Sequence, residues 1–268
     1  MENTPRLSIV TAYFNRKKLF LNTLDSINES PLASEIEMVV ADDASDDTER
    51  LEDIASDYKF PIHILRIEKK DKWYSNPCVP FNKAIKRATA DIVLIQNPEC
   101  YHVGDILGTA LTKTSEENYV VFSCYSLNEE QTNKLHHKEP FQITNKISTQ
   151  GGMEGWYNHP DINPRPYHFA SSLSRNTLNE LEGFDERYAE GIGFDDDEFL
   201  HRIKLRHLSL VSIKSPFVLH QNHYNVTDAD RWATDSTYRE KVFRNERLFK
   251  EQFKNSTDWR ANNEDSGI

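Results

Sequence analysis

Three sets of polar side chains in this sequence combine ligand-binding residue types with positions directly after apolar runs. Asp42 and Asp43 form the first set, Glu99 the second and His220 the third. Carboxylates and imidazoles are common ligands of divalent ions, and adjacent carboxylates also accept hydrogen bonds from N–H and hydroxyl groups. A structural interpretation exists for each set, because Asp is frequent in turns and a single histidine after a strand usually serves packing or lies at the surface.

A fourth set is the run Gly-Ile-Gly-Phe-Asp-Asp-Asp-Glu-Phe at 191–199. Four consecutive acids at the start of a helix are stabilised by the helix dipole, and that alone explains their presence. The preceding Gly-x-Gly, however, permits close approach of the backbone to a ligand, as a binding site requires. The run is therefore a candidate site as well as a candidate helix start.

Alternating strands and helices are predicted for the first hundred residues. Apolar runs predict strands, and apolar residues at helical spacing predict helices. The strands are expected at 7–13, 36–40, 62–67 and 92–95, and the helices at 16–27, 48–58 and 80–88. This alternation predicts a parallel, doubly wound α/β sheet. Asp43 and Glu99 then lie at the carboxyl edge of the sheet, which is where open α/β sheets bind ligands.

The second half of the chain does not continue this alternation. Segment 128–150 is polar and is expected to be a mobile excursion, and 151–157 is expected to be a flexible stretch with large aromatic residues. Further strands are expected at 119–125, 167–173, 208–213 and 217–220, and further helices at 195–206 and 235–253. We find no internal repeat.

Composition argues against several classes of protein. The 268 residues carry a net charge of -11 and show no basic patch, which argues against binding to nucleic acid. Cys78, Cys100 and Cys124 are odd in number and lack CxxC spacing, so neither a disulfide framework nor a zinc site is expected. The polar N-terminus and the lack of long apolar stretches predict a cytoplasmic protein without a transmembrane segment. The oligomeric state stays open.

The order of these motifs resembles that of the GT-A glycosyltransferases, most closely the family 2 enzymes. The resemblance covers about residues 6–225 and is carried by a strand ending Ile-Val-Thr-Ala-Tyr-Phe-Asn, a strand ending Val-Val-Ala-Asp-Asp-Ala-Ser, Asn76-Pro77 before a helix that opens near Asn82, and the strand that ends at Glu99. It implies the GT-A (Rossmann-like) nucleotide-diphospho-sugar transferase fold, an α/β fold with a mostly parallel central sheet.

The resemblance also implies a division of the chain. Residues 1–227 are expected to form the glycosyltransferase domain, with a nucleotide-binding half at about 1–115 and an acceptor-binding half at about 116–227. Residues 228–268 are expected to form a C-terminal helical extension. Donor and acceptor would then be bound by different segments of the chain.

The family's donor-site residues can be transferred position by position. The segment that lines the nucleotide pocket matches 11–13, and the aspartate that binds uracil matches Asp43. Asn97-Pro98-Glu99 stands where the family usually has Asp-x-Asp, the motif that binds the metal and the sugar diphosphate. Since Asn97 is neutral, Glu99 is the expected metal ligand. The implied nucleotide contacts are Thr11, Ala12, Tyr13, Asp42, Asp43, Asn82 and Asn97.

His220 matches the late histidine that completes the metal site in several GT-A enzymes, and His223 is the alternative. An imidazole ligand favours Mn²⁺ over Mg²⁺, while either ion suits carboxylate and phosphate oxygens. Aromatic side chains are candidate platforms for a sugar ring, namely Trp73, Trp156, Tyr157 and His159.

The acidic run at 191–199 looks like the Gly-Trp-Gly-x-Glu-Asp segment of galactosyltransferase-like GT-A enzymes, in which an acid binds acceptor hydroxyls and acts as base. This match makes Asp195 and Asp196 the catalytic candidates, with Asp196 as the expected base. The implied activity is that of a metal-dependent, inverting hexosyltransferase. It would move a sugar from a UDP-sugar to a glycan, protein or small-molecule acceptor. The alternatives are a non-catalytic sugar-nucleotide or glycan-binding protein and a metal-dependent phosphoester hydrolase.

Overall fold

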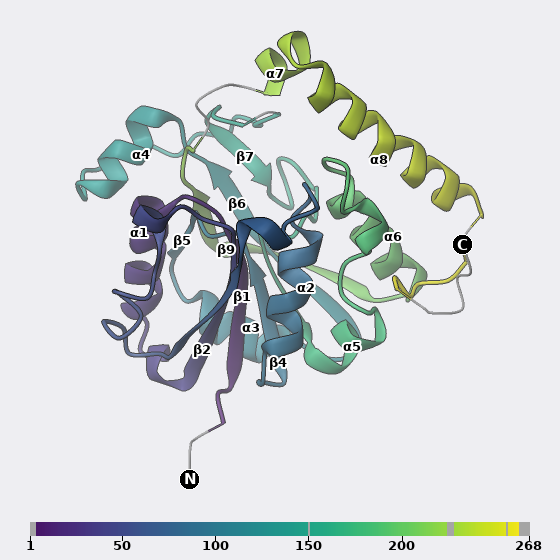
Figure 1. Cartoon of the computed structure of the whole chain (residues 1–268). Helices are drawn as coiled ribbons and strands as arrows, with labels where there is room; N and C mark the ends of the chain where they lie inside the picture. The colour runs from purple at the N-terminus through teal and green to yellow at the C-terminus, as the bar shows by residue number, and fades with distance from the viewer. Residues whose placement is uncertain (1–3, 150, 224–227, 256, 263–268) are drawn as a thin grey trace.

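The computed structural model describes residues 4–149, 151–223, 228–255 and 257–262, and within them nine strands form one mixed sheet (Figure 1). One half of the sheet is parallel, in the order β3-β2-β1-β4. Its strands are β1 (Leu7–Tyr13), β2 (Ile36–Asp43), β3 (Ile62–Ile67) and β4 (Ile92–Gln96). This half confirms the parallel arrangement that the apolar runs predict.

The other half of the sheet mixes strand directions. β8 (Ala170–Ser174) runs antiparallel to β4 and to β6 (Asn118–Ser126), and β9 (Ser209–His220) runs parallel to β6. β5 (Cys100–Val103) and β7 (Gly155–Asn158) pair antiparallel with β9 and β6. The carboxyl ends of β1, β2, β4, β6 and β9 therefore share one edge.

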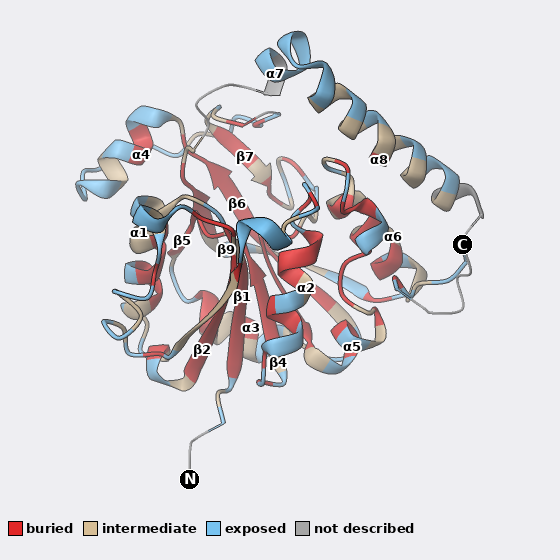
Figure 2. Ribbon diagram, viewed as in Figure 1, coloured by how far each residue is buried: buried red, intermediate tan, exposed pale blue. Residues whose placement is uncertain are grey.

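Helices cover both faces of the sheet (Figure 2). Alternate residues of the central strands pack against opposite layers, as the two-residue period of a strand requires. Val39 and Ile95 pack with α2, α5 and α6, whereas Val40 and Leu94 pack with α1 and α3. The helices are α1 (Lys17–Asn28), α2 (Cys78–Arg87), α3 (Ile106–Lys113), α4 (Glu129–His136), α5 (Arg175–Glu180), α6 (Asp195–Leu205), α7 (Asp228–Thr234) and α8 (Ser236–Asn255), with 3₁₀ turns η1 (Ala33–Glu35), η2 (Asp47–Glu49), η3 (Lys69–Asp71) and η4 (Glu186–Tyr188).

The helix predicted at 48–58 is wrong, because this stretch consists of η2 and successive turns. Its backbone amides bond three residues back rather than four, as in the bond from Ile54 to Leu51. Leu51 is fully buried, and the flanking acids Glu52 and Asp53 are held by ion pairs with Arg66 and Lys17. Tertiary contacts thus override the helical spacing of the apolar residues.

Several other predicted elements differ in extent. The expected mobile excursion at 128–150 contains α4, whose start has a capping box between Asn128 and Gln131. The two strands predicted at 208–213 and 217–220 are one strand, β9, with an irregularity in its pairing to β6. The strand predicted from 167 begins only at Ala170, and β5, β7 and α3 were not predicted.

The last helix, α8, packs on the loop that leads into α6 (Figure 1). Asn245 of α8 is fully buried and donates to the backbone oxygens of Tyr188 and Gly193. Gly191 permits this contact, because a Cβ atom there would lie 2.0 Å from Oδ1 of Asn245. In the described part of the chain, none of the helices combines the length and apolar character needed to span a bilayer.

Candidate active site

A carboxylate and two imidazoles meet at the carboxyl edge of the sheet. Oε1 of Glu99 lies 3.0 Å from Nε2 of His220 and 3.4 Å from Nε2 of His223. The potential ligand atoms of these three residues all lie within 4.8 Å of one another. The structure thus brings both histidines to Glu99, although the sequence left them as alternatives.

Strand pairing and packing position this cluster. Glu99 directly precedes β5 and His220 ends β9, and the β5–β9 pairing aligns Cys100 with His220. Between the two histidines, the buried Gln221 donates from Nε2 to the backbone oxygens of Glu99 and Leu19, both at 3.0 Å. The ring of His220 also packs edge to face on Tyr157 and Phe169. The cluster is therefore held from β5, β7, β9 and α1.

The protonation states in the cluster suit metal ligation. Burial opposes ionisation of Glu99, but the charge of Arg16 and the contacts with His223 and His220 outweigh burial and hold the pKa of Glu99 well below its usual range. Burial lowers the pKa of His223, against the opposing charge of Glu99. An ionised carboxylate and a neutral imidazole are the forms that bind metals.

The donor set fits a divalent transition ion better than Mg²⁺. Two histidines and one carboxylate would supply three ligands to an ion, and its other positions would be open to substrate oxygens and water. Mg²⁺ prefers oxygen ligands alone, whereas Mn²⁺ accepts imidazole. A cavity of about 370 Å³ between α1 and α4 opens on His223, so this side of the cluster is accessible.

A guanidinium group completes the cluster. Nη1 of Arg16 lies 2.8 Å from Oε2 of Glu99, the carboxylate oxygen that does not face the histidines. The Glu99 side chain is 2% exposed and that of Arg16 is 31% exposed. The sequence motifs did not identify Arg16 as a site residue. The one feature that could have identified it is a cationic residue at the start of the helix that follows β1.

The two predicted aspartates at the end of β2 have different surroundings. Asp42 is fully buried, lies 2.9 Å from the guanidinium of Arg66 and accepts from the backbone N–H of Ser45, so its contacts are those of a turn residue. Asp43 is partly exposed and accepts from Nζ of Lys72 and the hydroxyl of Tyr74, each at 2.7 Å. Of the two aspartates, Asp43 is the one available to a ligand.

The neighbouring segment 11–13 has little exposed side-chain surface. The side chains of Thr11 and Tyr13 are buried, and the Tyr13 hydroxyl donates to the backbone oxygen of Glu49. The Oγ1 atom of Thr11 has no hydrogen-bond partner within the described residues. By contrast, Phe14 is 44% exposed, and Nζ of Lys72 lies 4.6 Å from the centre of its ring. Tyr13 could therefore contact a nucleotide only through its backbone, whereas Phe14 offers a ring face.

Asn82 and Asn97 lie apart from each other. Asn82 donates to the backbone oxygen of Phe184 and accepts from the Phe184 N–H, so its side chain braces the loop before η4. This placement does not support the predicted nucleotide contact of Asn82. Asn97 directly follows β4, and its backbone N–H and C=O bond to Phe169 and Cys100. The Asn97 amide is therefore at the sheet edge, two residues before Glu99.

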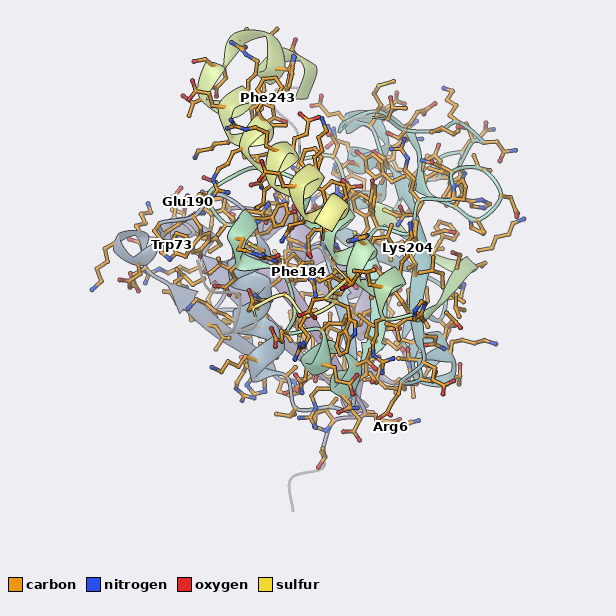
Figure 3. The ribbon with its side chains drawn as sticks, turned by 90° about the vertical axis from the view of Figure 1, so that its right-hand side faces the viewer. Arg6, Trp73, Phe184, Glu190, Lys204 and Phe243 are labelled. Carbon is orange, nitrogen blue, oxygen red and sulfur yellow. The ribbon has the colours of Figure 1, made fainter. Side chains whose placement is uncertain are left out.

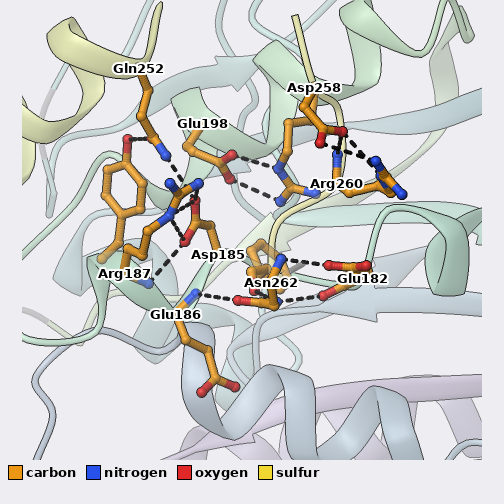
Figure 4. A network of polar contacts seen from close by, with 12 residues as sticks. Glu182, Asp185, Glu186, Arg187, Glu198, Gln252, Asp258, Arg260 and Asn262 are labelled. Atoms are coloured by element: carbon orange, nitrogen blue, oxygen red, sulfur yellow. Dashed lines mark hydrogen bonds and ion pairs between the residues drawn. The ribbon is translucent and has the colours of Figure 1, made fainter. Parts of the chain in front are cut away.

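Each acid at the start of α6 has a different partner. Asp195 is buried and accepts from Nδ2 of Asn76 at 2.9 Å, and Asp197 accepts from the hydroxyl of Tyr167 at 2.8 Å. The fourth acid, Glu198, forms a buried ion pair with Arg202 one turn along the helix, as Figure 4 shows around Glu198. Asp195 and Asp197 therefore link α6 to its surroundings, whereas Glu198 pairs within the helix.

Asp196 and Asp197 are partly exposed at this helix start, whereas Asp195 and Glu198 are buried. The side chain of Asp196 is 37% exposed, and its Oδ1 lies 2.6 Å from Nδ1 of the buried His168. Burial alone would lower the pKa of His168, but the charges of Asp196 and Asp195 outweigh it and raise this pKa. His168 was not predicted, because no sequence pattern links position 168 to position 196.

The predicted sugar platforms differ in exposure. Trp73 is 62% exposed and projects from the edge of the molecule near Glu190 in Figure 3. Trp156 and His159 are buried and pack on each other, with ring centroids 4.5 Å apart. Tyr157 stacks on Phe169 beside His220. Trp156 and His159 therefore serve the core, and Trp73 keeps a free ring face.

The sequence and the fold were compared with known proteins. The family model described as glycosyl transferase family 2 matches residues 8–179. S. aureus TarS 1–349 in complex with UDP-GlcNAc has a TM-score of 0.60 and 15% identity over 82% of this chain. The mannosyltransferase PcManGT from Pyrobaculum calidifontis, in complex with GDP-Man and Mn²⁺, has a TM-score of 0.56 and 15% identity over 95% of this chain and 66% of that chain. The chain spans 60% of the TarS chain that it matches. No curated protein matches the sequence.

Proposed function

The chain belongs to glycosyl transferase family 2, and from that premise we propose that it transfers a sugar from a UDP-sugar to an acceptor hydroxyl, with a divalent ion and with inversion at the anomeric carbon. The observation that carries this proposal is the cluster of Glu99, His220 and His223 at the carboxyl edge of the sheet. A divalent ion held there, preferably Mn²⁺, would neutralise charge on the diphosphate as the sugar leaves.

The surroundings of Asp43 support uracil as the base. The uracil edge has one N–H donor between two carbonyl acceptors. Asp43 supplies an acceptor, and Lys72 supplies a donor 2.7 Å away from it. The exposed ring of Phe14 lies beside Lys72 and would pack on the face of a base. These groups are complementary to a uracil base at the ends of β1 and β2.

The pairing of Asp196 with His168 supports Asp196 as the base that deprotonates the acceptor. His168 engages one carboxylate oxygen from the buried side. The other oxygen is then free to accept the proton of the attacking hydroxyl. A single displacement of this kind inverts the anomeric carbon and needs a base within hydrogen-bond distance of the attacking oxygen.

We also propose that the donor and the acceptor are bound by successive segments of the chain. Asp43, Asn97 and Glu99 come from the donor half at about 1–115, and Asp195 and Asp196 from the acceptor half at about 116–227. The acceptor half would also supply both histidines to the metal. Residues 228–268 would act as an extension that supports the acceptor side.

Calorimetry and turnover assays with the whole chain test the proposal. UDP should bind more tightly with Mn²⁺ than without it, and more tightly than GDP. A panel of UDP-sugars and GDP-sugars should show slow hydrolysis of a UDP-sugar and faster transfer when an acceptor is supplied. Rapid, acceptor-independent hydrolysis would indicate a hydrolase, and binding without any turnover would indicate a binding protein.

Replacement of Asp43 tests the base site separately. Asp43→Ala should weaken UDP binding with and without Mn²⁺ by roughly 1.5–3 kcal/mol, because a charged hydrogen-bond partner is lost. Asp46→Ala is the matched control, since Asp46 is an exposed acid of the same loop that pairs with Lys69. Unchanged UDP affinity in a folded Asp43→Ala variant would reduce Asp43 to a structural role.

A further inference from the structure

Among the arginine and lysine side chains of the described residues, only that of Arg16 lies within ion-pair distance of Glu99. It follows β1, and its backbone oxygen accepts the N–H of Phe20 in the first turn of α1. Its guanidinium reaches a carboxylate that is 2% exposed. A buried carboxylate without a compensating cation is costly, so Arg16 stabilises Glu99 when no metal is bound.

The charges of the cluster change with each ligand. When both histidines are neutral, the charges of Glu99 and Arg16 sum to zero. A divalent ion alone would add two positive charges beside the guanidinium, which is unfavourable in a largely buried site. A nucleotide sugar brings about two negative charges on its diphosphate, so the sum returns to about zero when the ion and the donor are both present.

We propose that Arg16 makes the binding of the divalent ion and of the donor diphosphate mutually dependent. Arg16 forms its ion pair with Glu99 when neither ligand is present. With a divalent ion at Glu99, the guanidinium of Arg16 would be released to the diphosphate, for which it is a suitable bidentate partner. This inference rests on the proposed function, because it assigns a diphosphate to the same site.

The position of Arg16 is compatible with this exchange of partners. Its side chain is 31% exposed, so the guanidinium has solvent on one side. It lies at the N-terminus of α1, a helix of 12 residues, where the helix dipole also favours an anion. The next residue, Lys17, is instead paired with the exposed carboxylate of Asp53. Only one of these two adjacent cations is therefore linked to the cluster.

The test measures Mn²⁺ affinity by calorimetry, without nucleotide and with saturating UDP. In the unmodified protein, UDP should raise Mn²⁺ affinity by a factor of about 5 to 150, the usual range for coupled sites. Arg16→Gln should bind Mn²⁺ alone several-fold more tightly, because the competing cation is gone. In the same variant, the factor by which UDP raises Mn²⁺ affinity should fall to the part that the ion and the diphosphate supply by attracting each other directly.

Two further variants separate this role from a general loss of charge or of structure. Arg16→Lys keeps the charge and should retain most of the coupling. Lys17→Gln removes a charge from the adjacent position and should leave both Mn²⁺ affinities unchanged, with melting curves confirming that all variants fold. If Arg16→Gln binds Mn²⁺ alone no more tightly than the unmodified protein, or keeps the full effect of UDP, the inference is overturned.

The outcomes also distinguish this inference from the proposed function. If UDP binds neither with nor without Mn²⁺, the assignment of a UDP-sugar donor fails. The Mn²⁺-only comparison then still decides whether Arg16 competes with metal for Glu99, since tighter binding by Arg16→Gln supports the competition and equal or weaker binding overturns it. If the unmodified protein binds UDP but no Mn²⁺, the Arg16 inference is overturned while UDP recognition stands.

Discussion

Identical residue types have different roles here because their partners differ. Asp42 and Asp43 are neighbours on β2, and successive side chains of a strand point to opposite faces. Asp42 is consequently buried against Arg66, and Asp43 is reached by Lys72 and Tyr74 from the side of the site. Asp195 and Asp196 likewise have different partners, since Asp195 accepts from the amide of Asn76 and Asp196 pairs with the imidazole of His168.

Replacing Glu99 by Gln should remove most of the increase in UDP affinity that Mn²⁺ produces. Gln keeps the size of the side chain but not the charge that a metal ligand needs. UDP affinity measured without metal should change less. The measurement is UDP calorimetry with and without Mn²⁺, beside a melting curve.

His220→Ala and His223→Ala extend this prediction to the imidazoles. We expect His220→Ala to raise the Mn²⁺ concentration needed for activity more than His223→Ala does, since His220 lies closer to Glu99 and is more buried. The control is His136→Ala, because His136 borders the adjacent cavity but is not part of the cluster. If UDP binding still depends on Mn²⁺ in the Glu99→Gln variant, the metal is bound by other residues.

His168 should make the protein's stability dependent on pH. Its pKa is raised in the folded state by Asp196 and Asp195, so folding favours the protonated imidazole. The resulting stabilisation is complete below the ordinary histidine pKa of about 6.5 and is lost as pH rises through the raised value. The free energy of unfolding of the unmodified protein, minus that of His168→Gln, should therefore decrease from about pH 6 upward.

Urea unfolding of both proteins at a series of pH values measures this difference. Subtracting the two curves removes the contributions of the other histidines. A difference that stays constant or grows with pH would show that the charge of His168 does not stabilise the fold.

At the scale of elements, the start of α6 is supported from several directions. Asp185 pairs with Arg187 and accepts from Gln252 of α8, and Asn262 bonds to the loop at Glu182 (Figure 4). Asn245 reaches Gly193, two residues before Asp195. The C-terminal segment thus fixes the loop from which α6 begins. A change in the packing of this segment should therefore alter the proposed acceptor site at the start of α6.

Asn245→Ala should lower the free energy of unfolding by about 1–3 kcal/mol, because two buried backbone oxygens lose a donor. We also expect a raised Michaelis constant for the acceptor with UDP affinity unchanged, since the altered contact lies next to α6. Glu246→Ala is the matched control, because within the described residues the ion pair of Glu246 is with Lys250 along α8. It should change stability by less than about 0.5 kcal/mol. Equal effects of the two changes would contradict a supporting role for Asn245.

At the scale of the molecule, donor and acceptor groups come from different segments and can be separated by mutation. Asp196→Asn should lower transfer by about 10²–10⁴-fold while UDP affinity stays nearly constant, because Asn keeps the size of Asp but cannot take a proton. Asp195→Asn should affect folding more than turnover, since Asp195 is buried against Asn76. The measurements are steady-state transfer, UDP calorimetry and melting curves.

The kinetic pattern decides the role of Asp196. A raised Michaelis constant for the acceptor with unchanged turnover would mean that Asp196 only binds the acceptor. Near-normal turnover in Asp196→Asn would place the base elsewhere, with Asp197 next to be tested because it is the other partly exposed acid of this run.

The sequence by itself determined the parallel half of the sheet and the polar residues at its edge. Hydrophobic periodicity is local, and a strand such as 92–95 is predicted from its own residues. The prediction that Glu99, Asp43 and the acids of 191–199 belong to sites also rested on short motifs. These features depend on neighbours in the chain, so one sequence suffices to find them.

Only the tertiary structure decided which of these residues meet. Glu99 and His220 are joined by the pairing of β5 with β9, and Asn76 and Asp195 lie 119 positions apart in the chain. The contacts of Arg16 with Glu99 and of His168 with Asp196 have no signature in local periodicity. Their formation depends on strand order and on the packing of helices across the sheet, which are properties of the whole chain.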